Sequence, residues 1–168
     1  MRHLSECQGH RDVSGVARVG RASMRAGYTK KRTVLPLLQY GVELRTAQMH
    51  AFIAAVGPTP FLEMRTGAMP LNCAMADSGR LLAEFALPEE WAVAEGAALK
   101  QTGEIWRAIT ISEGTAGYWR LKAMSGVVHA QGTVGSTGSG AALELDDPYL
   151  DPECVVTLQA FVISAGNA

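Results

Sequence analysis

The chain has 168 residues, of which 48% are apolar, 18% charged and 7% aromatic. This composition excludes a wholly disordered chain and predicts one globular domain with a sizeable core. No apolar run approaches the roughly 20 residues of a membrane span, and the start of the chain lacks the apolar stretch of a secretory signal, so we expect a soluble protein.

The net charge of −1 hides an asymmetry along the chain. Residues 1–33 hold eight basic and two acidic residues, about +6, whereas residues 34–168 carry about −7. We interpret residues 1–33 as a basic arm on an acidic body, and the arm is predicted to be largely irregular because it has no sustained hydrophobic period. The basic candidates for an interface in this arm are Arg18, Arg21, Arg25, Lys30, Lys31 and Arg32.

Three cysteines, Cys7, Cys73 and Cys154, form no CxxC pair and do not suggest a disulfide framework. His3, Cys7 and His10 could act as zinc ligands, but a structural zinc site needs four ligands at recognised spacings. No metal site and no cofactor is therefore predicted.

After the arm, residues 34–60 are predicted to contain one amphipathic helix and a linker. Met49, Phe52, Ile53 and Val56 repeat at i, i+3, i+4 and i+7, which predicts a helix over Val42–Val56. Gly57 and the proline after it end the helix, because glycine accepts the left-handed cap conformation and proline cannot continue the hydrogen-bond ladder.

Residues 61–168 alternate in short apolar and polar runs that predict seven strands separated by turns. This pattern indicates a mainly β protein, an antiparallel sandwich or jelly-roll-like domain preceded by the helix and the arm. The predicted strands are Leu62–Thr66, Leu81–Leu87, Ile105–Ser112, Tyr118–Ala123, Val127–Val134, Ala142–Asp146 and Val155–Ile163.

The strand Tyr118–Ala123 has the clearest alternation. Trp119 is expected on its buried face, while Tyr118, Arg120 and Lys122 are expected on an exposed face that a neighbouring copy could cover. Trp106 is a further candidate for a partner surface. Exposed aromatic rings could alternatively stack on sugars, which leaves a receptor- or glycan-binding module open.

Two other segments invite a site and receive a simpler interpretation. The glycine-rich run 132–140 lacks the Lys-Ser/Thr of a phosphate loop, so we expect a flexible hairpin connection there. Asp146, Asp147, Asp151 and Glu153 lack the spacing of an EF-hand and are expected to form a solvated acidic turn. No nucleophile elbow or paired-carboxylate arrangement is present, and we expect no enzymatic activity.

Beyond this alternation, residues 61–168 contain several characteristic stretches: 63–74 (EMRTGAMPLNCA), 79–83 (GRLLA), 87–88 (LP), 114–120 (GTAGYWR), 129–132 (HAQG) and 161–168 (FVISAGNA). In these stretches the chain resembles a family of small virion structural proteins of tailed bacteriophages. The resemblance implies a β-sandwich subunit of the virion, made in the bacterial host cytoplasm and without catalytic activity.

The expected function is therefore a capsid decoration or cement subunit that binds the major capsid protein or other virion proteins and forms a homo-oligomer in the particle. A head-tail junction protein, a tail component and a receptor- or glycan-binding module remain alternatives. Nucleic acid is expected to be contacted only through the basic arm, because the acidic body repels phosphate.

Overall fold

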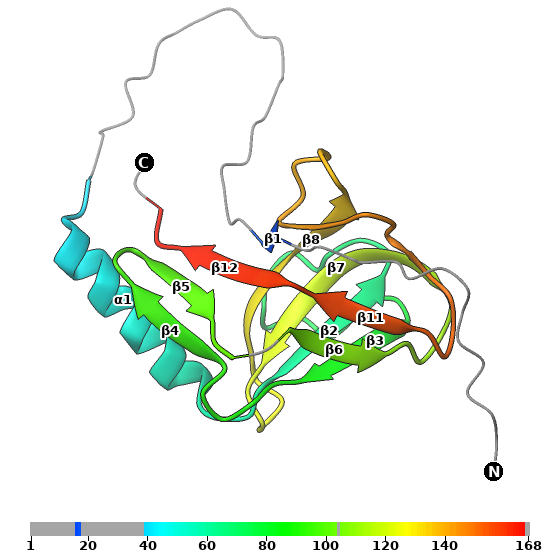
Figure 1. Ribbon diagram of the computed structural model, residues 1–168, viewed down its shortest axis with the longest axis horizontal. Coiled ribbons are helices and arrows are strands. Elements are labelled where there is room, and N and C mark those ends of the chain that lie inside the picture. The colour runs from blue at the N-terminus through cyan, green and yellow to red at the C-terminus, as the bar shows by residue number, and fades with distance from the viewer. Residues whose placement is uncertain (1–15, 18–38, 104, 167–168) are drawn as a thin grey trace, which may run out of the picture.

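The computed structural model describes residues 16–17, 39–103 and 105–166 of the chain. In these residues the protein is mainly β, with several antiparallel strand pairs and a single α-helix, α1 (Val42–Val56) (Figure 1). The strands are β1 (Val16–Ala17), β2 (Phe61–Thr66), β3 (Leu81–Ala86), β4 (Ala92–Glu95), β5 (Ala98–Gln101), β6 (Trp106–Ile109), β7 (Gly114–Lys122), β8 (Val128–Ser136), β9 (Leu143–Leu145), β10 (Tyr149–Leu150), β11 (Val155–Leu158) and β12 (Ala160–Ser164).

The helix has the predicted bounds. Met49 and Val56 are buried and Phe52 and Ile53 half-buried, which confirms the apolar face, and Gly57 ends the helix at φ 77° with its N–H bonded to the Ile53 carbonyl. This face packs on β4 and β5, where the Phe52 and Trp91 rings meet edge to face at 6.5 Å. In the described parts of the chain, the single helix lacks the length and apolar character that a bilayer crossing requires.

Each predicted strand segment contains a strand, and the last contains two, because the chain leaves β11 at Gln159 and enters β12. The prediction missed the β4–β5 hairpin, which lies between the predicted strands Leu81–Leu87 and Ile105–Ser112. Its alanines give little contrast between the two faces of each strand. It also missed β10, which pairs with the first residues of β7.

The strands of the described residues form one ten-stranded sheet and one two-stranded sheet. The main order is β3-β2-β7-β8-β9-β1-β12-β5-β4, with β10 paired to β7, and the path is open rather than closed into a barrel. The β6–β11 pair is joined to β3 by an isolated bridge between Thr110 and Ala83.

Two strand pairs, β8–β9 and β1–β12, are parallel. The hairpin connection expected in the run 132–140 is therefore wrong, because a hairpin joins antiparallel strands. Glu144 shapes this connection instead: its carboxylate accepts hydrogen bonds from the N–H groups of Gly138 (3.1 Å) and Gly140 (2.7 Å). The run is thus a glycine-rich loop folded around a carboxylate of its own chain.

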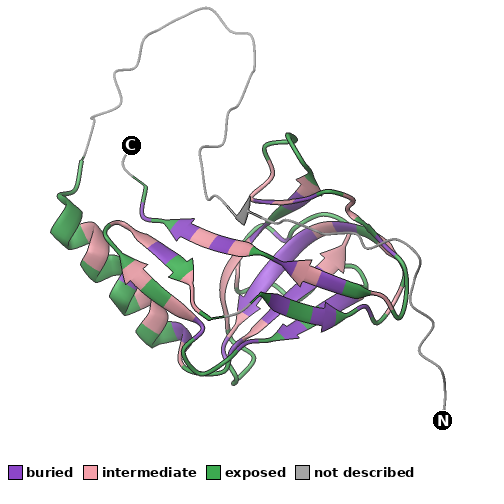
Figure 2. Ribbon diagram, in the orientation of Figure 1, coloured by how far each residue is buried: buried purple, intermediate pink, exposed green. Residues whose placement is uncertain are grey.

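The core lies where β7, β6 and β12 meet. The Phe161 ring of β12 contacts Trp119 of β7 and Trp106 of β6, each at 5.4 Å between ring centroids. Figure 2 shows that most of the buried residues lie in strands and that much of α1 is exposed. The prediction that Trp119 is buried is confirmed.

Candidate functional site

The polar face of the central strands is the richest cluster of charged side chains in the described residues. Glu63 on β2 lies directly beside Arg120 on β7, and Arg120 lies beside Gln131 on β8. The connection from Gly67 to Gly79 folds back over this face. It passes so close to β7 that a Cβ atom on Gly117 would lie 2.0 Å from the Gly67 carbonyl oxygen.

Three basic and two acidic side chains alternate across this face. Lys122 Nζ lies 2.7 Å from both Glu63 Oε1 and Asp77 Oδ2, and Arg65 Nε lies 2.7 Å from Glu63 Oε2. Asp77, on the covering segment, also binds Arg65 at 3.1 Å and Arg120 at 2.7 Å. The cluster carries a net formal charge of about +1, and each charge faces an opposite one.

Arg120 is the centre of the cluster, with 1% of its side chain exposed. Its Nε and Nη2 donate to Gln131 Oε1, its Nη1 donates to Asp77 and to the Met75 carbonyl, and its Nη2 also donates to the Asn72 carbonyl, at 2.7–3.2 Å. A guanidinium has five N–H donors, and all five are used. Arg120 therefore fixes the covering segment to the sheet and has no donor left for a ligand.

Tyr118 attaches the end of the same segment. Its hydroxyl accepts a hydrogen bond from the Ser78 N–H at 2.9 Å and donates to the Ser78 carbonyl. Gln131 holds the beginning, since its Nε2 donates to the Pro70 carbonyl at 2.6 Å. Residues 67–79 are thus bound to the sheet along their length by side chains of β7 and β8.

The expected exposure of the Tyr118, Arg120 and Lys122 face is therefore wrong. Tyr118 and Arg120 are fully buried, and only 13% of the Lys122 side chain is exposed. The alternation of the sequence correctly placed these three on one face, but a segment of the same chain covers that face. Their charges suggested contact with water, whereas they are neutralised by Glu63 and Asp77.

The charges and hydrogen bonds of the cluster shift the pKa values of Asp77 and Arg65. Burial raises the pKa of Asp77, but hydrogen bonds from Lys122 and Arg120, together with the positive charge of Arg65, outweigh this effect and hold the pKa below its usual value. Burial lowers the pKa of Arg65, and its hydrogen bond to Glu63 and the nearby carboxylates reverse this to a net rise. Both shifts stabilise the charged forms.

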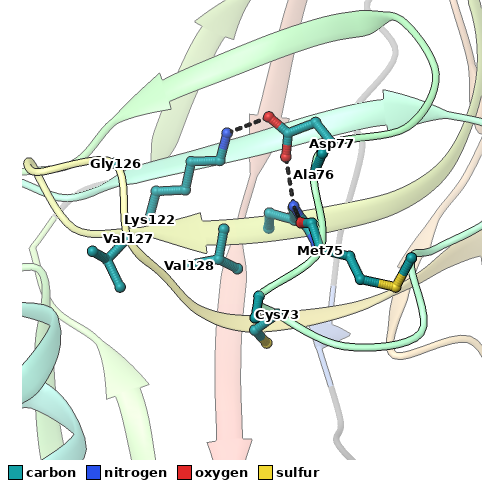
Figure 3. A pocket seen from close by; sticks show the side chains of 10 residues that line it. Cys73, Met75, Ala76, Asp77, Lys122, Gly126, Val127 and Val128 are labelled. Carbon is teal, nitrogen blue, oxygen red and sulfur yellow. Dashed lines mark hydrogen bonds and ion pairs between the residues drawn. The ribbon is translucent and has the colours of Figure 1, made fainter.

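Beside this cluster lies a cavity of about 480 Å³ between residues 73–77 and the turn from β7 to β8. Figure 3 shows Lys122 joined to Asp77 in its wall, with Val127 and Val128 on one side and Cys73 and Met75 on the other. Its charged side chains, Asp77, Arg120 and Lys122, are already engaged in the ion pairs. The described residues contain no group of His, Cys, Asp and Glu side chains that could hold a metal ion.

Sequence reasoning missed Glu63, Arg65, Asp77 and Gln131 as members of this cluster. Glu63 and Arg65 do show a signal, since they alternate in the same way as Arg120 and Lys122. Recognising it requires that β2 and β7 are neighbours, although β3 to β6 lie between them in the sequence.

The aromatic candidates are also buried. Trp106 is 5% exposed and Trp91, Tyr118 and Trp119 at most 1%, so the expected exposure of Trp106 and Tyr118 is wrong and these rings form no platform for a sugar. Trp106 is the first residue of β6 and lies on the same side of the strand as Ala108, which is buried. Its ring contacts Phe161 in the core.

The acidic turn is used in part by local hydrogen bonds. Asp146 accepts from the Thr137 hydroxyl at 3.1 Å, and Asp147 accepts from the Tyr149 N–H at 2.9 Å. The candidate zinc ligands His3, Cys7 and His10 lie outside the described residues. So do the arm candidates Arg18, Arg21, Arg25, Lys30, Lys31 and Arg32.

Three of the exposed large apolar side chains lie on or next to the two-stranded sheet. Ile109 on β6 and Val155 on β11 are directly paired, and 64% and 59% of each residue is exposed. Ile111, just beyond β6, is 60% exposed. We call these three residues the outer apolar face. Their neighbours on β6, Trp106 and Ala108, point into the core.

Comparison of the chain with protein-family models, with curated proteins and with solved structures found no match.

Proposed function

We propose that this protein is a structural protein of a bacteriophage virion, acting as a capsid decoration or cement subunit without enzymatic activity. The outer apolar face carries the proposal. Three β-branched side chains are each more than half exposed there: Ile109 and Val155 are paired across the two-stranded sheet, and Ile111 follows β6 by two residues. Exposed apolar side chains on neighbouring strands are typical of a protein-binding face.

The polar cluster supports the same function because its charged groups are already bound and are not available to a substrate. Its charged groups bind one another and the covering segment, and the Arg120 donors are all in use. These contacts hold the covering segment against the sheet. The cluster offers no nucleophile paired with a base of the kind that group-transfer chemistry requires. The resemblance of residues 61–168 to small virion proteins implies that the assembly is a phage particle. It also implies that the partner is the major capsid protein or another virion protein.

The same reasoning extends to the fold. We propose that the β2-β7-β8 strands and the strands β6, β11 and β12 form the two layers of a sandwich. The contacts of Phe161 with Trp119 and Trp106 support this arrangement, because they join side chains of both groups of strands. A head-tail junction or tail component would use the same outer face, and a density map of the particle distinguishes these locations.

The test is fractionation of phage particles that carry a substituted subunit. We expect Ile109→Lys to lower the copy number per particle while the melting temperature of the isolated protein stays unchanged, since the side chain is mostly exposed. Val93→Lys is the matched control, because Val93 is an exposed residue on the edge strand β4. Equal incorporation of both variants, or absence of the protein from purified particles, would contradict the proposal.

A further inference from the structure

Strand β1 occupies a slot between two strands from the far end of the chain. Val16 pairs with Glu144 of β9 on one side and with Ala160 of β12 on the other, and Ala17 pairs with Leu143 and Phe161. Figure 1 shows β1 beside β12. The N-terminal arm, which we expected to be largely irregular, thus contributes two residues to the sheet.

This slot needs an occupant. In the strand order β1 is the link between β9 and β12, so the sheet would divide there without it. The two edges exposed by its loss carry Leu143 and Phe161, which are fully buried core residues. Unpaired backbone groups on such edges bind other strands readily.

The slot does not determine which copy of the chain fills it. The pairing described for β1 involves the backbone of two residues, and any copy of the chain offers the same two. The connection to the rest of the fold, residues 18–38, is 21 residues long and can extend to about 70 Å. That length reaches the slot of a neighbouring copy as well as its own.

The charge distribution along the chain favours insertion into the slot of a neighbouring copy. Residues 18–33 contain six basic and no acidic residues, whereas residues 34–168 carry about −7. Two acidic bodies repel each other when they approach, and a basic connection that passes from one to the other offsets this repulsion. Exchange of a strand between copies preserves every pairing within the sheet, so it costs little beyond the entropy of the connection.

We propose that in the assembled protein the slot between β9 and β12 is filled by Val16 and Ala17 of a second copy. Adjacent subunits are then linked by a shared strand. On a lattice the second copy is held at high effective concentration, which favours exchange over closure within one chain. This inference rests on the proposed function for its setting and names the segment that joins the copies.

The test uses two single-cysteine variants of the full chain, Val16→Cys and Ala160→Cys, with Cys7, Cys73 and Cys154 changed to serine. Paired strands lie about 4.8 Å apart, within the range that a disulfide can bridge. An equimolar mixture, concentrated and then oxidised, should give a disulfide-linked heterodimer in roughly tenfold or greater excess over a control mixture of Val16→Cys and Arg107→Cys. Arg107 is exposed on β6 and is not part of the slot.

A chain that carries both Val16→Cys and Ala160→Cys gives a second measurement. Exchange predicts linked multimers on a non-reducing gel, and closure within one chain predicts a monomer with an internal disulfide. Internal disulfides alone, with no heterodimer in the mixture, would overturn the inference. If the protein still fractionated with particles in that case, the proposed function would stand; exchange in a protein absent from particles would overturn the function and keep the shared strand.

Discussion

The substitution Arg120→Ala tests whether the covering segment 67–79 is held by the polar cluster. It removes a buried guanidinium, so Asp77 loses one of its three basic partners, and Gln131 Oε1 and two backbone carbonyls lose the hydrogen bonds that Arg120 donates. Breaking a buried ion pair from one side costs about 3–5 kcal/mol. We expect the lower end, about 3 kcal/mol, because Asp77 keeps 28% of its side chain exposed and still binds Arg65 and Lys122.

Urea denaturation of the purified variant measures this loss. Arg107→Ala is the matched control, since Arg107 is exposed on β6, and a surface substitution of this kind changes the free energy of unfolding by about 0.5 kcal/mol or less. A double-mutant cycle with Asp77→Ala isolates the part of the effect that belongs to the ion pair.

A second readout follows the segment itself. Cys73 lies on it and is half-buried, so alkylation of Cys73, followed by peptide mass spectrometry, should become faster in Arg120→Ala. If Arg120→Ala denatures at the same urea concentration as Arg107→Ala and Cys73 reacts at the wild-type rate, the guanidinium does not hold the segment.

The remaining predictions concern acid stability, close packing and the two faces of β7. The folded-state pKa of Asp77 lies below the unfolded value of 3.8, so the stability that its carboxylate contributes is present above that pH and is lost as the pH falls further. Asp77→Asn should therefore reduce the loss of melting temperature at acidic pH, and an unchanged loss would contradict this. A Cβ on Gly132 would lie 2.7 Å from Trp119 Nε1, so Gly132→Ala should destabilise by about 1–3 kcal/mol in urea, while Gly166→Ala, with open space around it, should not. Trp119→Ala should lower the free energy of unfolding by about 3–5 kcal/mol. Tyr118→Ala should also lower it, because the Tyr118 ring is buried and its hydroxyl binds Ser78. If calorimetry gave the tyrosine variant wild-type stability, this face would be open.

The sequence alone determined the local elements of this protein. The apolar spacing from Met49 to Val56 and the glycine after it were enough for the helix, because a helix depends on neighbours three and four residues apart. Strong alternation likewise revealed the strand around Trp119. Weak alternation at β4 and β5 did not, since alanine distinguishes the two faces of a strand poorly.

Only the tertiary structure decided what those elements face. The period of two places Tyr118, Arg120 and Lys122 together, but it says nothing about what covers them, and their charges can be satisfied by water or by carboxylates of the same chain. The partners come from β2 and from residue 77, which reach β7 through pairings between distant parts of the chain. The parallel pairing of β8 with β9 and the insertion of β1 beside β12 depend on contacts of the same long-range kind, which a local pattern does not contain.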